Sequence, residues 1–400
     1  MDTSMTESQV LLNAQLGFLD THLALIHIPL EVYPFFVQPI LRLLLHNDRV
    51  DIDGQLNTPQ RPWMFWHPFV NISITPSECS VVCPREQAEK LFMPVVDKIP
   101  PLLRKSVAVS KEDYSVIMIG GEGLEAGKRV LDLTSPLALA GIPIFFITSY
   151  YCDFILVPLS SRSRVISALE ERGFVFEADA VGEAGHMMNP ASPLVSTRAR
   201  KDSIGSFDFP LAVGTPPPAT VPELQTRTFK LLRRNGISPK ADPNIELVTC
   251  AGIKDSTAST SAVNFSQGKL QLGISKCLTT DPPPKFLSVT LTDSESASLT
   301  LEKTLVSHFF NDGEDLLLGK DGPEQVPITL DLKDLPLEST GIVCGVASRL
   351  TDGMKGRIGD IFNMSYLSTA KAGHVIVYMD ELEEAMDALG QAEQNGFGEH

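Results

Sequence analysis

Short apolar segments occur in pairs along this chain, and a segment with helical spacing follows each pair. The clearest pair lies in residues 141–158, GIPIFFITSYYCDFILVP, where two apolar runs flank the polar centre TSYYCD. Apolar residues then recur at helical spacing in residues 159–173, LSSRSRVISALEERG. Because β-branched and aromatic residues dominate both runs, the pattern predicts a strand, a tight turn, a second strand and a helix.

The same pattern recurs at three other places in the chain. The strand pairs are expected in residues 69–83 (FVNISITPSECSVVC), 286–301 (FLSVTLTDSESASLTL) and 361–377 (IFNMSYLSTAKAGHVIV). A strand and a helix upstream complete each unit, as with the apolar run VIMI at 116–119 and the helical spacing after Gly123. The resulting order, βαββαβ, is ferredoxin-like. For the third unit the pattern does not place the first strand.

These repeats predict an α+β fold of four ferredoxin-like βαββαβ modules in a 2+2 arrangement. The expected ranges are 10–95 for unit one, 111–178 for unit two, 223–325 for a degenerate unit three and 326–392 for unit four. Residues 179–222 between the two halves contain GTPPPATVP and have no apolar periodicity. Their composition predicts a flexible linker rich in proline and serine.

Composition and charge exclude several classes of partner. The chain has 400 residues and a formal net charge of −16, so it is long enough for several domains and too acidic to neutralise a nucleic-acid backbone. Its six cysteines form no zinc-binding pattern and predict reduced core thiols in a cytoplasmic protein. We therefore expect no metal, no cofactor and no nucleic acid. The N-terminus, MDTSMTESQV, does not resemble a secretory signal.

A membrane span is the alternative interpretation of one segment. Residues 136–159 hold a single charge, Asp153, and are long enough to cross a bilayer as a helix. Gly141 and Pro143 disfavour a helix there, and the polar centre TSYYCD interrupts the apolar run. The segment therefore predicts two buried strands, and no contact with a membrane is expected.

Motifs that carry enzymatic chemistry are missing from the sequence. The chain has no nucleophile elbow, no HExxH and no paired catalytic acids at a recognisable spacing. Four modules also account for most of the 400 residues and leave no room for a separate catalytic domain. We therefore expect no catalytic residues and a protein that is not an enzyme.

The strand pairs at 141–158 and 361–377, together with LESTGIV at 337–343, resemble the ACT-domain superfamily of amino-acid-binding modules. More closely, the chain resembles the CASTOR group of cytosolic arginine sensors, which have four tandem ACT domains. The resemblance covers units two and four well, unit one moderately and unit three weakly. It implies a non-catalytic sensor or adaptor that holds a free amino acid between units two and four.

The resemblance also implies which residues contact the ligand. They are Pro143 and Ile144 at the strand start of unit two; Pro336, Ser339, Gly341, Ile342 and Val343 at the strand-to-helix turn of unit four; and Thr369, Ala370 and Gly373 in the hairpin of unit four. This set is physically reasonable, because a helix N-terminus offers unpaired N–H groups to a carboxylate and a glycine permits close approach to the backbone.

Two departures from the family bear on the ligand. Arginine selectivity in the family depends on two acidic residues, and this chain has Gly373 and Ser339 at those positions. A buried guanidinium without a carboxylate loses a charge-assisted partner, a loss of roughly several kcal/mol. Arginine is therefore not expected to bind. A neutral amino acid, an acidic amino acid and no ligand all stay open.

A partner surface is implied in the same way. In the family, the hairpin of unit two contacts a regulatory protein complex upstream of the TOR kinase, and the matching residues here are Tyr150, Tyr151 and Asp153. Adjacent tyrosines at a turn are typical of interface hot spots. The exposed sheet edges of ACT units also leave a homodimer open.

Two further alternatives stay open at this point. A constitutive ACT scaffold that has lost ligand binding accounts equally well for the residues at 339 and 373. The segment RARKDS at 198–203 fits a basophilic kinase motif that would phosphorylate Ser203, and a solvated basic loop is the simpler interpretation.

Overall fold

The computed structural model describes residues 15–45, 65, 67–120, 126–176, 218–253, 260–311, 314–353 and 364–390. The predicted linker lies outside the described residues from 179 to 217, and so does Ser203. The last predicted linker residues, 221 and 222, begin a helix instead.

The first half of the chain contains two successive groups of strands and helices. The first group consists of β2 (Leu23–Ile28), α2 (Tyr33–Leu45), β3 (Phe69–Ile74), β4 (Cys79–Pro84), the helical segment formed by α3 (Arg85–Gln87), η2 (Ala88–Phe92), α4 (Met93–Lys98) and α5 (Pro101–Arg104), and β5 (Ala108–Val109). The second group consists of β6 (Tyr114–Gly120), α6 (Ala126–Leu139), β7 (Phe145–Thr148), β8 (Asp153–Pro158), α7 (Arg162–Glu170) and β9 (Val175–Phe176). A short strand, β1 (Gln15–Phe18), precedes both groups.

The second half repeats this layout. It begins with α8 (Val221–Arg234) and β10 (Lys240–Ala241). The third group consists of β11 (Leu247–Gly252), α9 (Thr260–Leu278), β12 (Leu287–Thr292), β13 (Ser298–Glu302), η6 (Lys303–Phe309), the small pair β14 (Phe310–Asn311) and β15 (Glu314–Asp315), and β16 (Leu317–Leu318). The fourth consists of β17 (Gln325–Asp331), α10 (Ile342–Gly353), β18 (Ser365–Ser368), β19 (Ala372–Tyr378) and α11 (Leu382–Gly390).

Strand pairing joins the groups crosswise, the first with the third and the second with the fourth. Sheet I has the order β5-β2-β4-β3-β12-β13-β11-β16, and β3 pairs with β12 from Phe69–Thr292 to Ile74–Leu287. Sheet II has the order β9-β1-β6-β8-β7-β18-β19-β17-β10. Single residue pairs, Leu23–Tyr114 and Leu247–Gln325, connect the sheets, so the strand pairing closes on itself.

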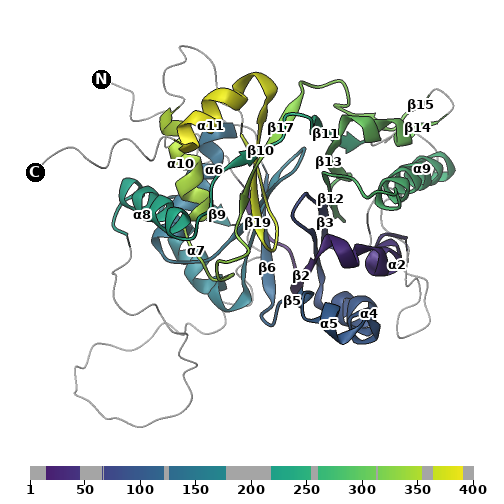
Figure 1. The fold of residues 1–400 in the computed structure, drawn as a ribbon, viewed down its shortest axis with the longest axis horizontal. Helices are drawn as coiled ribbons and strands as arrows, with labels where there is room; N and C mark the ends of the chain where they lie inside the picture. Colours follow the sequence, from purple (N-terminus) through teal and green to yellow (C-terminus); the bar gives the residue numbers. More distant parts are fainter. Residues whose placement is uncertain are drawn as a thin grey trace, which may run out of the picture.

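Helices cover the outer faces of both sheets (Figure 1). One apolar core lies between sheet I and α2, η2, α4 and α9, and a second lies between sheet II and α6, α7, α8, α10 and α11. A third core lies between the two sheets and consists of strand and loop residues such as Leu25, Phe69, Phe154 and Leu367. The protein is therefore layered as helices, sheet, sheet and helices, which buries both faces of each sheet.

The prediction of mixed helices and antiparallel strands is confirmed, and so is the interpretation of residues 136–159. That segment ends helix α6 and then forms β7 and β8, which pair as a hairpin. No helix in the described part of the chain is long and apolar enough to cross a membrane. The closed strand pairing was not predicted. The four-module division stays a prediction.

Two short strands cross the unit ranges expected from the sequence. Strand β1, inside the range expected for unit one, pairs with β6 of the second group. Strand β10, inside the range expected for unit three, pairs with β17 of the fourth group. Strand β11 then supplies the first strand of the third group, which the sequence pattern did not place. The first described strand of each half thus extends sheet II.

Candidate functional site

The two sheets differ at their centres. In sheet I, β3 and β12 pair along six residues, and Asn71 fills the junction with hydrogen bonds to Ser288 Oγ (3.2 Å) and Thr290 Oγ1 (3.0 Å). In sheet II, the described register between β7 and β18 consists of Ile147 opposite Leu367. Sheet II is therefore much less continuous at its centre than sheet I.

Beside the single backbone pair at this junction, side-chain hydroxyls accept two backbone N–H groups. The N–H of Phe146 donates to Ser368 Oγ at 2.9 Å, and the N–H of Tyr366 donates to Thr148 Oγ1 at 3.0 Å. Pro143, just before β7, has no N–H to contribute. The described register does not extend to Ile144, and open space lies beside this residue.

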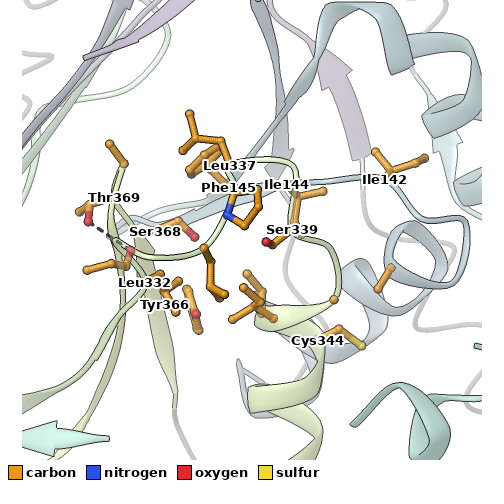
Figure 2. A pocket seen from close by; sticks show the side chains of 18 residues that line it. Ile142, Ile144, Phe145, Leu332, Leu337, Ser339, Cys344, Tyr366, Ser368 and Thr369 are labelled. Carbon is orange, nitrogen blue, oxygen red and sulfur yellow. Dashed lines mark hydrogen bonds between the residues drawn. The ribbon is translucent and has the colours of Figure 1, made fainter. Parts of the chain in front are cut away.

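A cavity of about 60 Å³ occupies this space. Its lining comes from the end of α6 and the start of β7, from the loop between β17 and α10, from the start of α10 and from the β18–β19 hairpin: Ala138, Ile142, Ile144, Phe145, Leu332, Leu335, Pro336, Leu337, Ser339, Gly341, Ile342, Val343, Cys344, Tyr366, Ser368, Thr369, Ala370 and Ala372. Figure 2 shows Ser339 and Cys344 on one side of the cavity and Ser368 and Thr369 on the other.

The N-terminus of α10 forms one wall of the cavity. Gly341 precedes it with φ of +79°, a conformation that residues with a side chain rarely adopt. Helix α8 fixes this end of α10, because Thr228 Oγ1 donates to the carbonyl of Gly341 at 3.2 Å. A Cβ at Gly345 would lie 2.6 Å from Thr228 Oγ1, so the two helices pack closely at this point. The first-turn N–H groups of α10 are thereby held at the cavity wall.

The side chain of Tyr366 is a second polar group at the cavity. Tyr366 is 1 % exposed, and a Cβ at Gly373 would lie 2.4 Å from its hydroxyl oxygen. Among the described residues the hydroxyl has no hydrogen-bond partner, and burial raises the pKa of Tyr366. Glycine at position 373 therefore leaves the space that the ring and hydroxyl of Tyr366 occupy.

Behind the hairpin, the buried carboxylate of Glu78 connects the cavity to sheet I. Its Oε1 accepts from Thr369 Oγ1 at 2.7 Å and from the N–H of Lys371 at 2.6 Å, and its Oε2 lies 2.5 Å from His27 Nδ1. The N–H of Leu332, in the loop that lines the cavity, donates to the carbonyl of Lys371 at 2.8 Å. A continuous series of hydrogen bonds therefore runs from the cavity loop to sheet I.

Most of the ligand residues expected from the sequence lie together at this cavity. Ile144, Pro336, Ser339, Gly341, Ile342, Val343, Thr369 and Ala370 line it. Pro143 and Gly373 do not: Pro143 adjoins the lining residue Ile144, and Gly373 lies beneath Tyr366. The Thr369 hydroxyl donates to Glu78 Oε1, so its oxygen lone pairs can still accept a hydrogen bond.

Sequence reasoning missed Tyr366, Ser368 and Glu78. A signal existed for Glu78, which is an acidic residue in a hairpin turn between two apolar strands. Nothing in the local pattern distinguishes Tyr366 from the aromatic residues that fill the cores, because its importance depends on Gly373 across the hairpin.

The three expected partner residues lie in different environments. Tyr150 and Tyr151 are 36 % and 41 % exposed, and their rings make an edge-to-face contact with centroids 4.9 Å apart. Asp153 is instead buried, with Arg129 Nε 2.5 Å from its Oδ2. Burial raises the pKa of the Asp153 carboxyl, while the neighbouring Arg129 guanidinium and Thr148 hydroxyl lower it. The expectation that Asp153 faces a partner is therefore wrong, because helix α6 covers it.

Tyr150 also has an internal role. Its N–H donates to Ser298 Oγ at 2.8 Å, and a Cβ at Gly319 would lie 2.7 Å from its ring. The hairpin of the second group therefore rests on the third group, as the hairpin of the fourth group rests on Glu78 of the first.

Metal-binding and thiol chemistry receive no support from the described residues. They contain no group of three or more His, Cys, Asp or Glu side chains placed to hold a metal ion. All six cysteines are buried and free, and burial raises their pKa values, for Cys344 to about 11. High pKa values disfavour the reactive thiolate form.

Comparison with known proteins identifies one family within the chain. Residues 109–171, from the end of β5 through α7, match the family model of the ACT domain. The chain therefore contains an ACT domain, and this domain supplies the β7 side of the cavity. No curated protein matches the chain.

Three solved structures are similar to parts of the chain. A protein from Agrobacterium tumefaciens is 19 % identical, with 41 % of this chain and 92 % of that chain covered and a TM-score of 0.27. Aspartate kinase from Synechocystis is 12 % identical, with 97 % of this chain and 57 % of that chain covered and a TM-score of 0.30. The ligand-free regulatory subunit of aspartate kinase from Thermus thermophilus is 14 % identical, with 38 % and 94 % covered and a TM-score of 0.23. Scores this low do not show a shared overall fold.

Proposed function

We propose that this protein is a non-catalytic amino-acid sensor of four ACT modules, arranged two and two, with its ligand in the cavity at the centre of sheet II. The ACT domain at 109–171 supports this class of function, because ACT modules are regulatory modules that bind amino acids. The second and fourth groups of strands and helices both contribute lining residues, which supports a ligand at this position.

One observation carries the proposal. A helix N-terminus with its first-turn N–H groups lies at the wall of a cavity that is also lined by Tyr366, whose hydroxyl makes no hydrogen bond to another described residue. Such N–H groups favour a carboxylate, both as hydrogen-bond donors and through the helix dipole. A free amino acid supplies that carboxylate and further polar groups for the hydroxyl.

Ligand binding would be communicated through the loop between β17 and α10. This loop lines the cavity and is connected through Lys371 to Glu78 in sheet I. A ligand that favours one position of the loop would shift the population of hairpin positions, provided that it binds the two states with different affinity. The carboxylate of Glu78 is the point at which such a shift reaches the other sheet.

The downstream assignment rests on the family resemblance. We propose that the protein is cytoplasmic and passes the state of its site to a regulatory complex upstream of the TOR kinase, with Tyr150 and Tyr151 on the contacting surface. Their exposed aromatic pair supports such a contact, since tyrosine is enriched at interface hot spots. A homodimer belongs to the same proposal, and light scattering after size-exclusion chromatography tests it.

The test is thermal unfolding of the full chain with each of the twenty amino acids, followed by titration calorimetry of those that stabilise it. A ligand at 100 times its Kd should stabilise the native state by about 2.7 kcal/mol. Ser339→Leu, which fills the cavity from the loop, should abolish the shift. Thr340→Leu, the neighbouring substitution outside the lining, should retain it. If no amino acid shifts the melting temperature or gives a heat of binding, the sensor function is rejected. The constitutive scaffold without ligand binding is then the favoured function.

A further inference from the structure

The lining of the cavity is uncharged throughout. Its eighteen residues include no aspartate, glutamate, lysine, arginine or histidine. The two lining residues that can ionise, Cys344 and Tyr366, are buried, and burial raises both pKa values, so both side chains are neutral at neutral pH. A charged ligand side chain held in this cavity would find no opposite charge and would lose its hydration.

The nearest buried acid does not change this picture. Glu78 contacts Thr369 from the far side of the hairpin and is itself not among the lining residues. Its two oxygens are already engaged by Thr369, Lys371 and His27. A cationic side chain in the cavity is therefore separated from this carboxylate by the hairpin.

The cavity opens toward solvent, so its volume sets no upper limit on the length of a ligand side chain. Its uncharged lining instead favours a ligand side chain that is itself uncharged.

The hydroxyl of Tyr366 gives the site a polar contact for such a ligand. It is 1 % exposed, belongs to a residue that lines the cavity and has no hydrogen-bond partner among the described residues. A ligand group within hydrogen-bond distance of this hydroxyl would add a hydrogen bond to the complex and so gain affinity. Apolar lining residues such as Ile144 and Leu335 surround the remaining space and favour an uncharged side chain.

We infer that the ligand is an amino acid with an uncharged side chain, and that the Tyr366 hydroxyl is one of its hydrogen-bond partners. This inference rests on the proposed function, since it assigns the ligand class of the same cavity. It excludes arginine and lysine for lack of a carboxylate in the lining, and glutamate and aspartate for lack of a cation.

Titration calorimetry of the wild-type full chain with glycine, alanine, serine, leucine, phenylalanine, arginine, lysine, aspartate and glutamate tests the inference. At least one amino acid with an uncharged side chain should bind ten times more tightly than arginine, lysine, aspartate or glutamate. Equal or tighter binding of a charged amino acid overturns the inference and leaves the sensor function standing. No binding by any amino acid overturns both.

Tyr366→Phe tests the role of the hydroxyl separately. Loss of one neutral hydrogen bond should weaken binding of the amino acid that binds most tightly by about 3–10-fold. Because the hydroxyl has no partner without ligand, the melting temperature of the ligand-free variant should not fall. Unchanged affinity, or a lower melting temperature without ligand, overturns the assignment of Tyr366. Should the variant fail to fold, the structural role is shown to dominate and the assignment is likewise overturned.

Discussion

Glu78 offers the sharpest test of how the hairpin at the cavity is held. Its side chain is buried, and replacing it with leucine removes the acceptor for the Lys371 N–H and the Thr369 hydroxyl while keeping a similar volume. Breaking a buried charged cluster by removing one partner costs about 3–5 kcal/mol. We therefore expect Glu78→Leu to lower the free energy of unfolding by about that amount.

Glu78→Gln separates the acceptor geometry from the charge. Its amide oxygen can occupy the position of Oε1 and keep both bonds to Thr369 and Lys371, while its NH₂ group faces His27 Nδ1. Only the charge assistance of these bonds is then lost, so the expected cost is about 1–2 kcal/mol. The glutamine variant should therefore fall between the wild type and the leucine variant.

Urea unfolding followed by far-UV circular dichroism measures all three proteins. Glu86→Leu, on the exposed surface of the same strand–helix unit, is the matched control and should change stability by less than about 0.5 kcal/mol. If Glu78→Leu lowers the free energy of unfolding by less than about 1 kcal/mol, the hydrogen bonds of Glu78 do not hold the hairpin in place. A loss for Glu78→Gln as large as for Glu78→Leu refutes the acceptor explanation and assigns the effect to charge.

Two further predictions concern the inner face of the hairpin. Gly373→Ala places a Cβ 2.4 Å from the Tyr366 hydroxyl and should lower the free energy of unfolding by about 1–3 kcal/mol. The control Gly268→Ala, in open space on helix α9, should raise it by up to about 1 kcal/mol. Adding Tyr366→Phe should restore most of the stability that Gly373→Ala removes, and urea unfolding of the single and double variants measures each change. Burial lowers the pKa of His374 from 6.5 to about 4 against the opposing effect of Glu78. Between these pH values the unfolded chain binds a proton that the folded chain does not, so stability should fall by about 3 kcal/mol as pH drops from 6.5 to 4, and His374→Gln should flatten that slope in urea titrations at several pH values.

The sequence by itself determined the local elements of this protein. The alternation of apolar and polar residues in 141–158 and 361–377 is enough to predict the β7–β8 and β18–β19 hairpins, because a strand pair and its turn depend on neighbours in the chain. Gly341 and the LESTGIV segment similarly indicate the helix start at α10. A resemblance carried by these same short segments predicted eight of the eighteen residues that line the cavity, including Ile144 and Thr369.

The tertiary structure decided which distant segments meet, and local patterns do not contain that information. The insertion of β1 beside β6, the pairing of β3 with β12 and the clamp of Glu78 on Thr369 each join residues far apart in the chain. Asp153 shows the same limit, because its turn reads as exposed until Arg129 of α6 covers it. The uncharged character of the cavity likewise arises only when four separate segments converge, since the charge of a site is the sum over every wall that faces it.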